Sequence, residues 1–188
     1  MNHSSRMDST DTAIAVHGTL VEVFGMGVLL LGSSGSGKSD LALGLVDRGH
    51  SLVADDQVEF VVAEGQLLGS CRPGCAGFIE VYGLGVVDLA RLYGEQALCQ
   101  QVCLGLVLSL ETADDHQPQL YDRLVCQQRD WRLLGVSVRE LLLPCGQGRN
   151  LPLLVETAVR LNRLWQQGYN GAAEFEACQS ALMREEHV

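Results

Sequence analysis

The sequence predicts an α/β domain built on a mixed and largely antiparallel sheet, with flanking helices and further helices at the C-terminus. Segments with strand character outnumber helical ones, and tight glycine-containing turns join many consecutive strands. A glycine-rich loop also connects one apolar strand directly to a helix. This combination departs from an ordinary doubly wound nucleotide-binding domain, in which parallel strands alternate with helices.

The bulk composition limits the class of protein. With 188 residues, 47% of them hydrophobic, the chain suits one domain with a continuous core. We expect residues 1–14 to form a disordered N-terminal tail and residues 15–188 to form the domain. A net charge of −10 excludes a broad nucleic-acid-binding surface, and no apolar stretch resembles a signal peptide or a membrane span. We therefore expect a cytoplasmic protein whose seven cysteines are reduced, buried hydrophobic residues.

The first half of the chain predicts hairpins around a single helix. Apolar runs at residues 19–24 and 28–31 flank Gly25-Met26-Gly27, which indicates a hairpin that leads into the glycine-rich loop. A helix is expected from Lys38 to the stop signal at Gly49. Further strands are expected at residues 51–54, 57–62, 66–69, 78–81 and 85–89.

The second half predicts fewer strands and two helices. Residues 102–110 are the strongest candidate for a buried strand, and residues 131–143 hold one or two more. Residues 151–165 have apolar positions at helical spacing, with Asn150 as N-cap. A last helix is expected at residues 172–184, while the polar stretch 111–118 is expected to be exposed.

The glycine-rich loop reads G-x-x-x-x-G-K-S, the pattern of a phosphate-binding loop. It comprises Gly32, Ser33, Ser34, Gly35, Ser36, Gly37, Lys38 and Ser39. The glycines let backbone N–H groups turn toward an anion, Lys38 reaches the terminal phosphates, and Ser39 can bind Mg²⁺. We expect ATP or a related phosphate donor, and we expect the Lys38 side chain to face solvent when no nucleotide is bound.

Acidic residues that could serve phosphoryl transfer follow the helix. Asp55 and Asp56 end a strand that returns the chain to the edge of the sheet where the phosphates bind. Because strand side chains alternate, the two carboxylates need not face the same way, and one could organise a metal while the other takes a proton. Glu80 is a second acidic candidate, although it could equally belong to the polar face of a strand.

Other polar residues are weaker candidates on pattern alone. His17 precedes the first hairpin and could reach phosphate, but a single histidine is more often structural. Arg123 and Arg149 could stabilise developing phosphate charge, although isolated arginines are usually surface groups.

Several short segments, taken together, carry a more specific signal than the loop alone. They are His17-Gly18, residues 32–39, Arg48-Gly49-His50, residues 52–56, residues 79–88, Asp122-Arg123-Leu124, Gly148-Arg149-Asn150-Leu151 and Gly168-Tyr169-Asn170. In this order and at nearly this spacing they resemble the catalytic domain of bacterial HPr kinase/phosphorylase. The resemblance runs from about Ala15 to the C-terminus.

The resemblance implies a P-loop kinase domain of the HPr kinase type that uses ATP and Mg²⁺. Members of that family phosphorylate a serine of the small phosphocarrier protein HPr, and they can remove the phosphate with inorganic phosphate to give pyrophosphate. The resemblance also implies a homo-oligomer, specifically a hexamer. By position, Lys38 would contact the transferred phosphate, Ser39 and Glu80 would bind Mg²⁺, and Asp56 would be the base that accepts the serine proton.

Further roles and departures follow from the same resemblance. His17 would be an active-site histidine and Arg123 a catalytic arginine. Residues 144–149, with Pro144, Gly148 and Arg149, would correspond to the segment tied to phosphorolysis. The chain departs from the family pattern at Tyr82 and Gly146, where basic residues are usual, and it has no room for the N-terminal domain of longer members. We expect the absence of basic side chains at Tyr82 and Gly146 to affect phosphorolysis, regulation or partner contacts more than ATP binding.

The sequence leaves two other functions open. A small-molecule kinase could use the same fold, since the phosphate chemistry needs only a positioned hydroxyl group. A nucleotide-binding regulator with little turnover is the other alternative, because Tyr82 and Gly146 stand where cations are expected.

Overall fold

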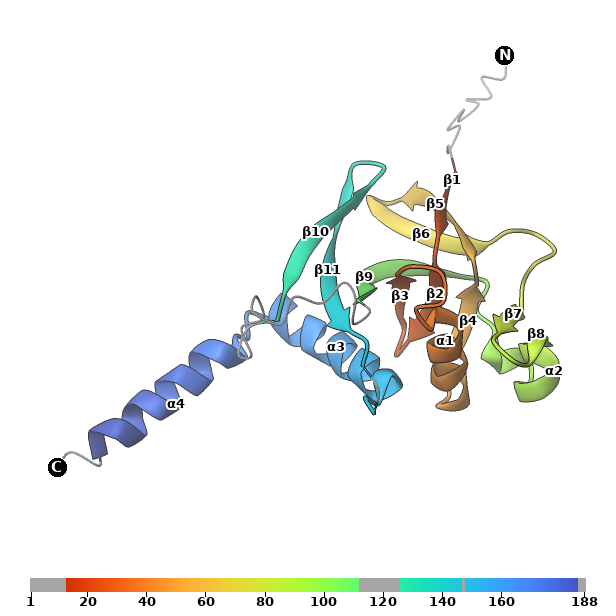
Figure 1. Ribbon diagram of the computed structural model, residues 1–188. Coiled ribbons are helices and arrows are strands. Elements are labelled where there is room, and N and C mark those ends of the chain that lie inside the picture. Colours follow the sequence, from red (N-terminus) through yellow and green to blue (C-terminus); the bar gives the residue numbers. More distant parts are fainter. Residues whose placement is uncertain (1–12, 112–125, 147, 186–188) are drawn as a thin grey trace, which may run out of the picture.

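The computed structural model describes residues 13–111, 126–146 and 148–185. Its body is a nine-stranded sheet in the order β1-β5-β6-β9-β3-β2-β4, with β11 pairing with both β9 and β10 (Figure 1). The strands are β1 (Ile14–His17), β2 (Thr19–Val23), β3 (Met26–Leu31), β4 (Ser51–Ala54), β5 (Gln57–Ala63), β6 (Gln66–Cys71), β9 (Gln101–Glu111), β10 (Gln128–Leu133) and β11 (Val136–Pro144). Within the described residues, β9 is parallel to β3 and β11, and the other pairs are antiparallel. The predicted mixed, largely antiparallel sheet is confirmed.

A separate two-stranded sheet, four α-helices and one short 3-10 helix, η1 (Glu95–Ala97), complete the described fold. β7 (Phe78–Val81) and β8 (Gly85–Asp88) pair only with each other. The α-helices are α1 (Lys38–Asp47), α2 (Leu89–Tyr93), α3 (Leu151–Gln166) and α4 (Gly171–Glu185). In Figure 1, α1 and α3 lie beside each other on one side of the main sheet, whereas α4 extends away from the body. None of these helices is long and apolar enough to cross a membrane.

Three details differ from the elements expected from sequence. The turn between β2 and β3 is Phe24-Gly25, with φ of 52° and 81°, so Met26 and Gly27 already belong to β3. The strand β1 was not expected, and it pairs along the edge of β5. Leu89 opens α2 instead of ending a strand, because the Asp88 side chain caps the helix by accepting a hydrogen bond from the Arg91 backbone N–H.

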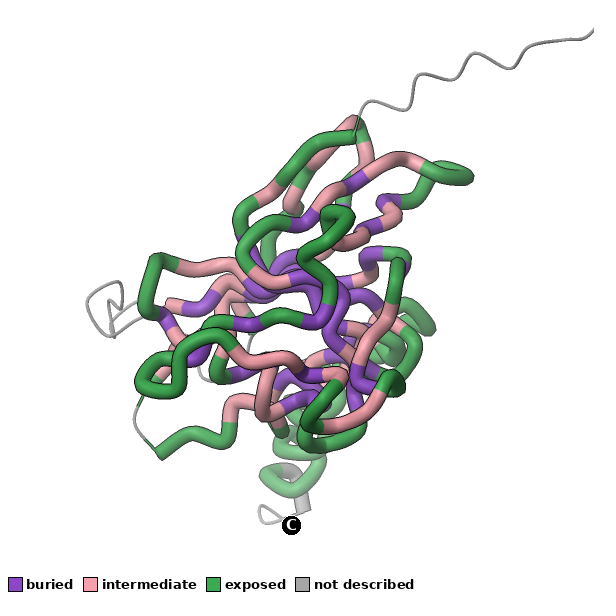
Figure 2. Tube along the Cα trace, turned by 90° about the vertical axis from the view of Figure 1, so that its right-hand side faces the viewer, coloured by how far each residue is buried: buried purple, intermediate pink, exposed green. Residues whose placement is uncertain are grey.

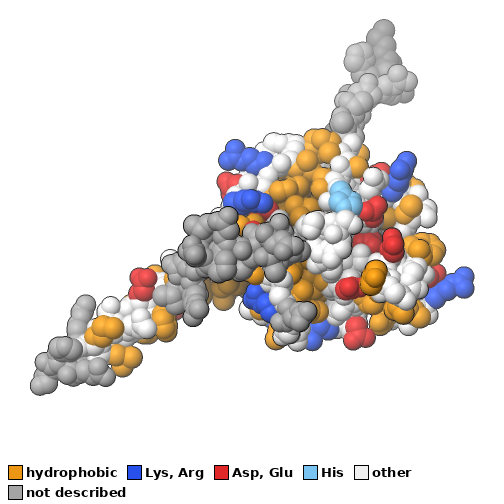
Figure 3. All heavy atoms as spheres, in the orientation of Figure 1, with side chains coloured by type: hydrophobic (Ala, Val, Ile, Leu, Met, Phe, Trp, Pro, Cys, Tyr) orange, Lys and Arg blue, Asp and Glu red, His pale blue; other side chains and the backbone are white. Residues whose placement is uncertain are grey.

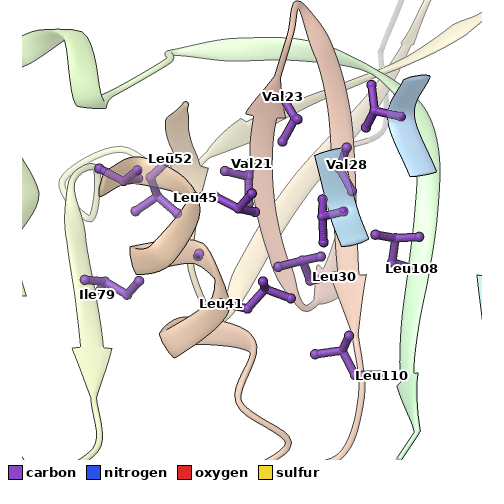
Figure 4. Close-up of a cluster of buried hydrophobic side chains, with 14 of the residues drawn as sticks. Val21, Val23, Val28, Leu30, Leu41, Leu45, Leu52, Ile79, Leu108 and Leu110 are labelled. Atoms are coloured by element: carbon purple, nitrogen blue, oxygen red, sulfur yellow. The ribbon is translucent and has the colours of Figure 1, made fainter. Parts of the chain in front are cut away.

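The main core lies between the sheet and the two helices that cover it. Alternate residues of β2 and β3 point toward α1, and Figure 4 shows Val21, Val28 and Leu30 facing Leu41 and Leu45 of that helix. A second cluster, around Leu20, Leu29 and Phe60, fills the opposite face of the sheet. Figure 2 shows this buried interior surrounded by exposed turns. The strands that carry the glycine-rich loop are therefore buried on both faces.

The small hairpin is attached to the same core. Ile79 and Val81 of β7 are buried, and Figure 4 shows Ile79 pointing toward α1. Because strand side chains alternate, Phe78 and Glu80 point the other way, and both are exposed. The Gly77 carbonyl accepts a hydrogen bond from the Leu89 N–H across the base of the hairpin.

A buried ionic cluster joins the end of α1 to α3. Arg48 donates two 2.7 Å hydrogen bonds to the Glu156 carboxylate, and His50 Nε2 lies 3.2 Å from Glu156 Oε1. The paired Arg48 guanidinium lowers the pKa of Glu156 to about 2, with a further contribution from the His50 hydrogen bond. The Arg48-Gly49-His50 segment therefore has a structural role between helices.

The cysteine expectation was wrong in one respect. All seven are free thiols, but none is fully buried: four are exposed and three are intermediate.

Candidate active site at the phosphate loop

The glycine-rich loop lies where the sheet meets the first helix. β3 ends at Leu31 and α1 begins at Lys38, so residues 32–37 make the connection. Gly35 and Gly37 have φ of 77° and 87°, the left-handed backbone conformation that glycine adopts without strain. Gly37 is the N-cap of α1 and makes no side-chain cap hydrogen bond, which leaves the N–H groups of the first helical turn facing a potential anion.

Lys38 does not face solvent, so that expectation was wrong. Its side chain is only 9% exposed. Nζ donates hydrogen bonds of 3.1 Å to both the Gly32 and Ser33 carbonyls. The ammonium group is thus held by the loop's own carbonyl oxygens, and Lys38 lines the cavity described below.

Ser36 supplies an independent indication that the loop is built to hold a ligand. Its hydroxyl oxygen is buried and has no hydrogen-bond partner among the residues that the structure describes. An unpaired buried polar group costs about 1–3 kcal/mol. The loop is also closed tightly around this side chain, since a Cβ atom at Gly32 would come within 2.6 Å of Ser36 Oγ. A phosphate oxygen is a suitable acceptor for this hydroxyl.

Asp55 joins three elements at the mouth of the loop. Its Oδ1 accepts a 2.7 Å hydrogen bond from the hydroxyl of Thr19 on β2, and its Oδ2 accepts one of 3.1 Å from Ser39 on α1. The Glu80 backbone N–H on β7 lies 3.4 Å from Oδ2. Ser39 Oγ also lies 3.3 Å from Oδ1, so two hydroxyl groups hold this carboxylate beside the C-terminal end of the phosphate loop.

Asp55 and Asp56 both line the candidate cavity, but they lie in the turn between β4 and β5 and have different partners. Asp56 has φ of 66°, and its side chain is exposed. Oδ1 lies 3.1 Å from His17 Nδ1 at the end of β1, so the histidine orients one oxygen of the carboxylate. The two adjacent aspartates thus have different environments: Asp55 is held among hydroxyl groups, and Asp56 is presented to solvent.

A cavity of about 570 Å³ brings most of the predicted site together. Its lining comprises His17, Ser34, Gly35, Gly37, Lys38, Ser39, Asp40, Asp55, Asp56, Glu80 and Tyr82. Four carboxylates face one lysine and one histidine in this lining. The excess negative charge means that an anionic ligand would need a cation to accompany it.

Six described residues of the predicted site are not part of this lining. Three of them, Gly32, Ser33 and Ser36, still belong to the phosphate loop: the first two accept hydrogen bonds from Lys38, and Ser36 is buried. The other three are Pro144, Gly148 and Arg149, and Arg149 Nη1 donates a 2.8 Å hydrogen bond to the Pro144 carbonyl. Arg123 and residues 112–118 lie outside the described residues, as does residue 147.

Thr19 is the functional candidate that sequence reasoning missed. It is completely buried, and its hydroxyl points to Asp55. The available signal was a polar residue at the start of an apolar strand, directly after His17-Gly18, at a position where a buried hydroxyl group needs a partner.

The fold and the site define a phosphate-loop protein of mixed α/β architecture with two differently placed carboxylates. The chain belongs to the family described as HPr Serine kinase C-terminal domain, whose model matches residues 9–179. The family expected from the sequence is therefore confirmed.

Individual relatives agree with this assignment. The HPr kinase/phosphorylase of Caldanaerobacter subterraneus is 45% identical over 162 residues, which are 86% of this chain and 52% of that protein. The HPr kinase/phosphorylase of Chromobacterium violaceum is 42% identical over 161 residues, which are 85% of this chain and 51% of that protein. The chain spans about half the length of these curated relatives.

A solved structure shows the same fold. The Hpr(Ser) kinase/phosphatase from Coxiella burnetii superimposes with a TM-score of 0.77 at 39% sequence identity, covering 86% of this chain and 98% of that one.

Proposed function

We propose that this chain is an ATP- and Mg²⁺-dependent protein serine kinase that phosphorylates an HPr-like phosphocarrier protein in the cytoplasm. The observation that carries the proposal is the arrangement of Ser39, Asp55 and Asp56 at the mouth of the phosphate loop. The loop supplies a phosphate site, and the two aspartates separate the metal-binding task from the proton-accepting one.

ATP and Mg²⁺ fit the residues present. The unpaired Ser36 hydroxyl and the uncapped start of α1 suit phosphate oxygens. Ser39 Oγ and the Asp55 carboxylate would hold Mg²⁺, with Glu80 nearby. The described residues contain no cluster of three or more histidine, cysteine or acidic metal ligands. This suits Mg²⁺, which commonly takes one or two protein ligands and completes its shell with phosphate oxygens and water. When bound, the cation would neutralise charge on the phosphates.

The remaining residues account for the transfer step. Lys38 would exchange its two carbonyl partners for the transferred phosphoryl group, whose charge its ammonium stabilises. Asp56 would accept the proton of the acceptor serine through Oδ2, because Oδ1 is the oxygen that lies 3.1 Å from His17 Nδ1. Run in reverse with inorganic phosphate, the same groups would serve phosphorolysis to pyrophosphate, and Asp56 would then return the proton.

We further propose that the protein works as a homo-oligomer, a hexamer by its family resemblance. α4 supports this proposal, because it extends from the body with Phe175, Leu182 and Met183 exposed (Figure 1). A helix of this length is marginally stable in water without tertiary packing. Light scattering on the purified chain measures the mass of the assembly.

One experiment separates the proposed function from its alternatives. The purified protein is incubated with labelled ATP, Mg²⁺, an HPr-like phosphocarrier and a metabolite extract. Label on a serine of the phosphocarrier supports the proposal. Label on metabolites alone indicates a small-molecule kinase. Nucleotide binding without transfer to either indicates a regulator, the function that would explain an exposed Tyr82 where the family usually has a cation.

A further inference from the structure

A buried carboxylate on β11 takes no part in the transfer chemistry proposed above. Glu140 is 3% exposed, and it stands directly opposite Arg129 in the register of β10 and β11. Arg129 donates hydrogen bonds of 2.7 and 2.8 Å to the two carboxylate oxygens, and the hydroxyl of Ser109 on β9 donates a third, to Oε1. The Arg129 guanidinium lowers the pKa of Glu140, so the carboxylate is ionised at neutral pH. These three residues, here called the Glu140 cluster, join three adjacent strands through one buried charge.

The arginine of the Glu140 cluster does not depend on this pairing for its solvation. The Arg129 side chain is 62% exposed, and in Figure 3 basic side chains lie on the surface over β10, at the upper left. A buried ion pair also adds little net stability, because the cost of removing the carboxylate from water offsets the attraction. What a two-pronged arginine–carboxylate pair does supply is a fixed geometry. The Glu140 cluster therefore fixes how β10, β11 and β9 lie against one another.

This fixed geometry extends to the edge of the sheet that carries the phosphate loop. β9 is parallel to both β3 and β11, so these three strands end at the same edge. Ser109 lies between its neighbours, opposite Leu31 of β3 and opposite Leu142 of β11. Leu31 is the last residue of β3 before the loop. Ser109 thus connects the buried charge to the position from which the loop starts.

The next residue of β9 lies against the loop itself. A Cβ atom at Gly32 would come within 3.1 Å of the Leu110 carbonyl oxygen, so the loop backbone packs directly on the end of β9. The Gly32 carbonyl accepts one of the two hydrogen bonds from Lys38. A shift of β9 would therefore move the start of the loop and the ammonium group that it holds.

We propose that Glu140 is a positioning residue for the nucleotide: it holds β9 through Ser109, and β9 supports the first glycine of the phosphate loop. The inference rests on the ATP site of the proposed function and adds to it a residue that touches no ligand. In metal sites, replacing a group that orients the ligands costs about 10–100-fold in affinity or activity. We expect the lower end of that range, because the Glu140 cluster acts on the loop through the backbone of β9.

The test measures the Kd for ATP in the presence of Mg²⁺, together with the Tm of each variant. Ser109→Ala removes the link to β9 but leaves the ion pair between Glu140 and Arg129. Glu140→Gln removes the charge that both partners bind. Each change is expected to raise the Kd about tenfold. Ser109→Thr, which keeps the hydroxyl group, is expected to keep the wild-type Kd.

The matched control is Glu156→Gln. It also removes a buried carboxylate that an arginine binds, but its partner Arg48 follows the last residue of α1, at the opposite end of that helix from the loop. This variant is expected to lower Tm and to leave the Kd for ATP unchanged when binding is measured well below the Tm of every variant. Affinity and stability are thereby separated.

The outcomes are distinct. An unchanged Kd in folded Ser109→Ala and Glu140→Gln overturns the positioning role and leaves the kinase function intact. A rise of the same size in Glu156→Gln also overturns it, because the change in Kd would then follow from lost stability. If Glu140→Gln does not fold, the comparison of Ser109→Ala with Ser109→Thr decides. Wild-type protein that binds ATP but phosphorylates no phosphocarrier contradicts the proposed function, while the Kd values still decide the positioning role.

Discussion

The hydroxyl group of Thr19 donates a 2.7 Å hydrogen bond to Oδ1 of Asp55, although 36 positions separate the two residues in the sequence. The contact forms because β2 pairs with β4, and Asp55 directly follows the last residue of β4. Thr19 therefore fixes the carboxylate that also faces Ser39. It is a positioning residue, since it acts on the site only through Asp55.

Replacing Thr19 with valine should weaken the metal site while preserving side-chain volume. The carboxylate would lose one of its two hydroxyl partners, and losing such a supporting hydrogen bond typically costs about 10–100-fold in metal affinity. We expect the Mg²⁺ concentration for half-maximal activity to rise about tenfold, within that range, with a smaller change in kcat. Thr19→Ser, which keeps the hydroxyl group, should restore the wild-type requirement. Equal Mg²⁺ requirements in wild type and Thr19→Val would show that this contact serves stability alone.

The two acidic candidates should give different phenotypes. Asp56→Asn should still bind ATP and Mg²⁺ but transfer the phosphoryl group at least about a hundredfold more slowly, because it cannot accept the serine proton. Glu80→Gln should chiefly raise the Mg²⁺ requirement. Titrating each variant with nucleotide and metal, followed by single-turnover transfer, separates the two effects. Matching losses of metal and nucleotide binding in both variants would mean that the base is assigned to the wrong residue.

Tyr82 should make the enzyme a better kinase than phosphorylase. Phosphorolysis brings inorganic phosphate into a site that already holds a phosphoserine, and this approach needs cations that Tyr82 and Gly146 do not supply. Tyr82→Arg should speed pyrophosphate release from phosphorylated carrier about tenfold and forward transfer less. Tyr82→Phe serves as the control without added charge. Wild-type pyrophosphate release as fast as forward transfer would refute this reasoning.

The Glu156 cluster should make stability fall in acid. The pKa of Glu156 is lowered from 4.5 to about 2 in the folded protein, so its stabilising effect is complete above about pH 4.5 and is lost as pH falls toward 2. At neutral pH, Glu156→Gln should lower Tm by about 5 °C, because Arg48 and His50 lose their anionic partner. The Tm difference between Glu156→Gln and the wild-type protein should become smaller below pH 4.5, where the wild-type carboxylate begins to be protonated. Asp130→Asn, which removes a surface ion pair with Arg132, should change Tm little at any pH. If the Tm difference between Glu156→Gln and wild type stayed constant down to pH 2, the ionised Glu156 carboxylate would not be the source of the stabilisation.

Local patterns were sufficient to predict most of the fold. Three features that depend on neighbouring residues lie where the pattern placed them. They are the strand–loop–helix order around Gly32 to Ser39, the Asn150 cap of α3, and the strand that ends at Ala54, directly before Asp55. α2 was missed because five residues are too few to show helical periodicity. Its only local signal was the capping side chain of Asp88.

The missed features of the site depend on residues far apart in the chain. The partner of Thr19 is set by strand pairing, and Glu156 meets Arg48 across 108 positions. The buried position of Lys38 was missed for another reason. Its ammonium group binds the carbonyl oxygens of Gly32 and Ser33, and a residue pattern does not predict which backbone oxygens the folded loop brings within reach of a lysine.

The central claim is tested most directly by weighing an HPr-like phosphocarrier after incubation with this protein, ATP and Mg²⁺, with Lys38→Ala as the matched control. Tandem mass spectrometry then locates the modified residue. We predict the gain of one phosphoryl group on a serine with wild-type protein, and at least about a hundredfold slower gain with Lys38→Ala, because no other lysine lines the cavity described here. Circular dichroism checks that the variant remains folded. No mass gain with the wild-type protein, or an equal gain with folded Lys38→Ala, would contradict the account.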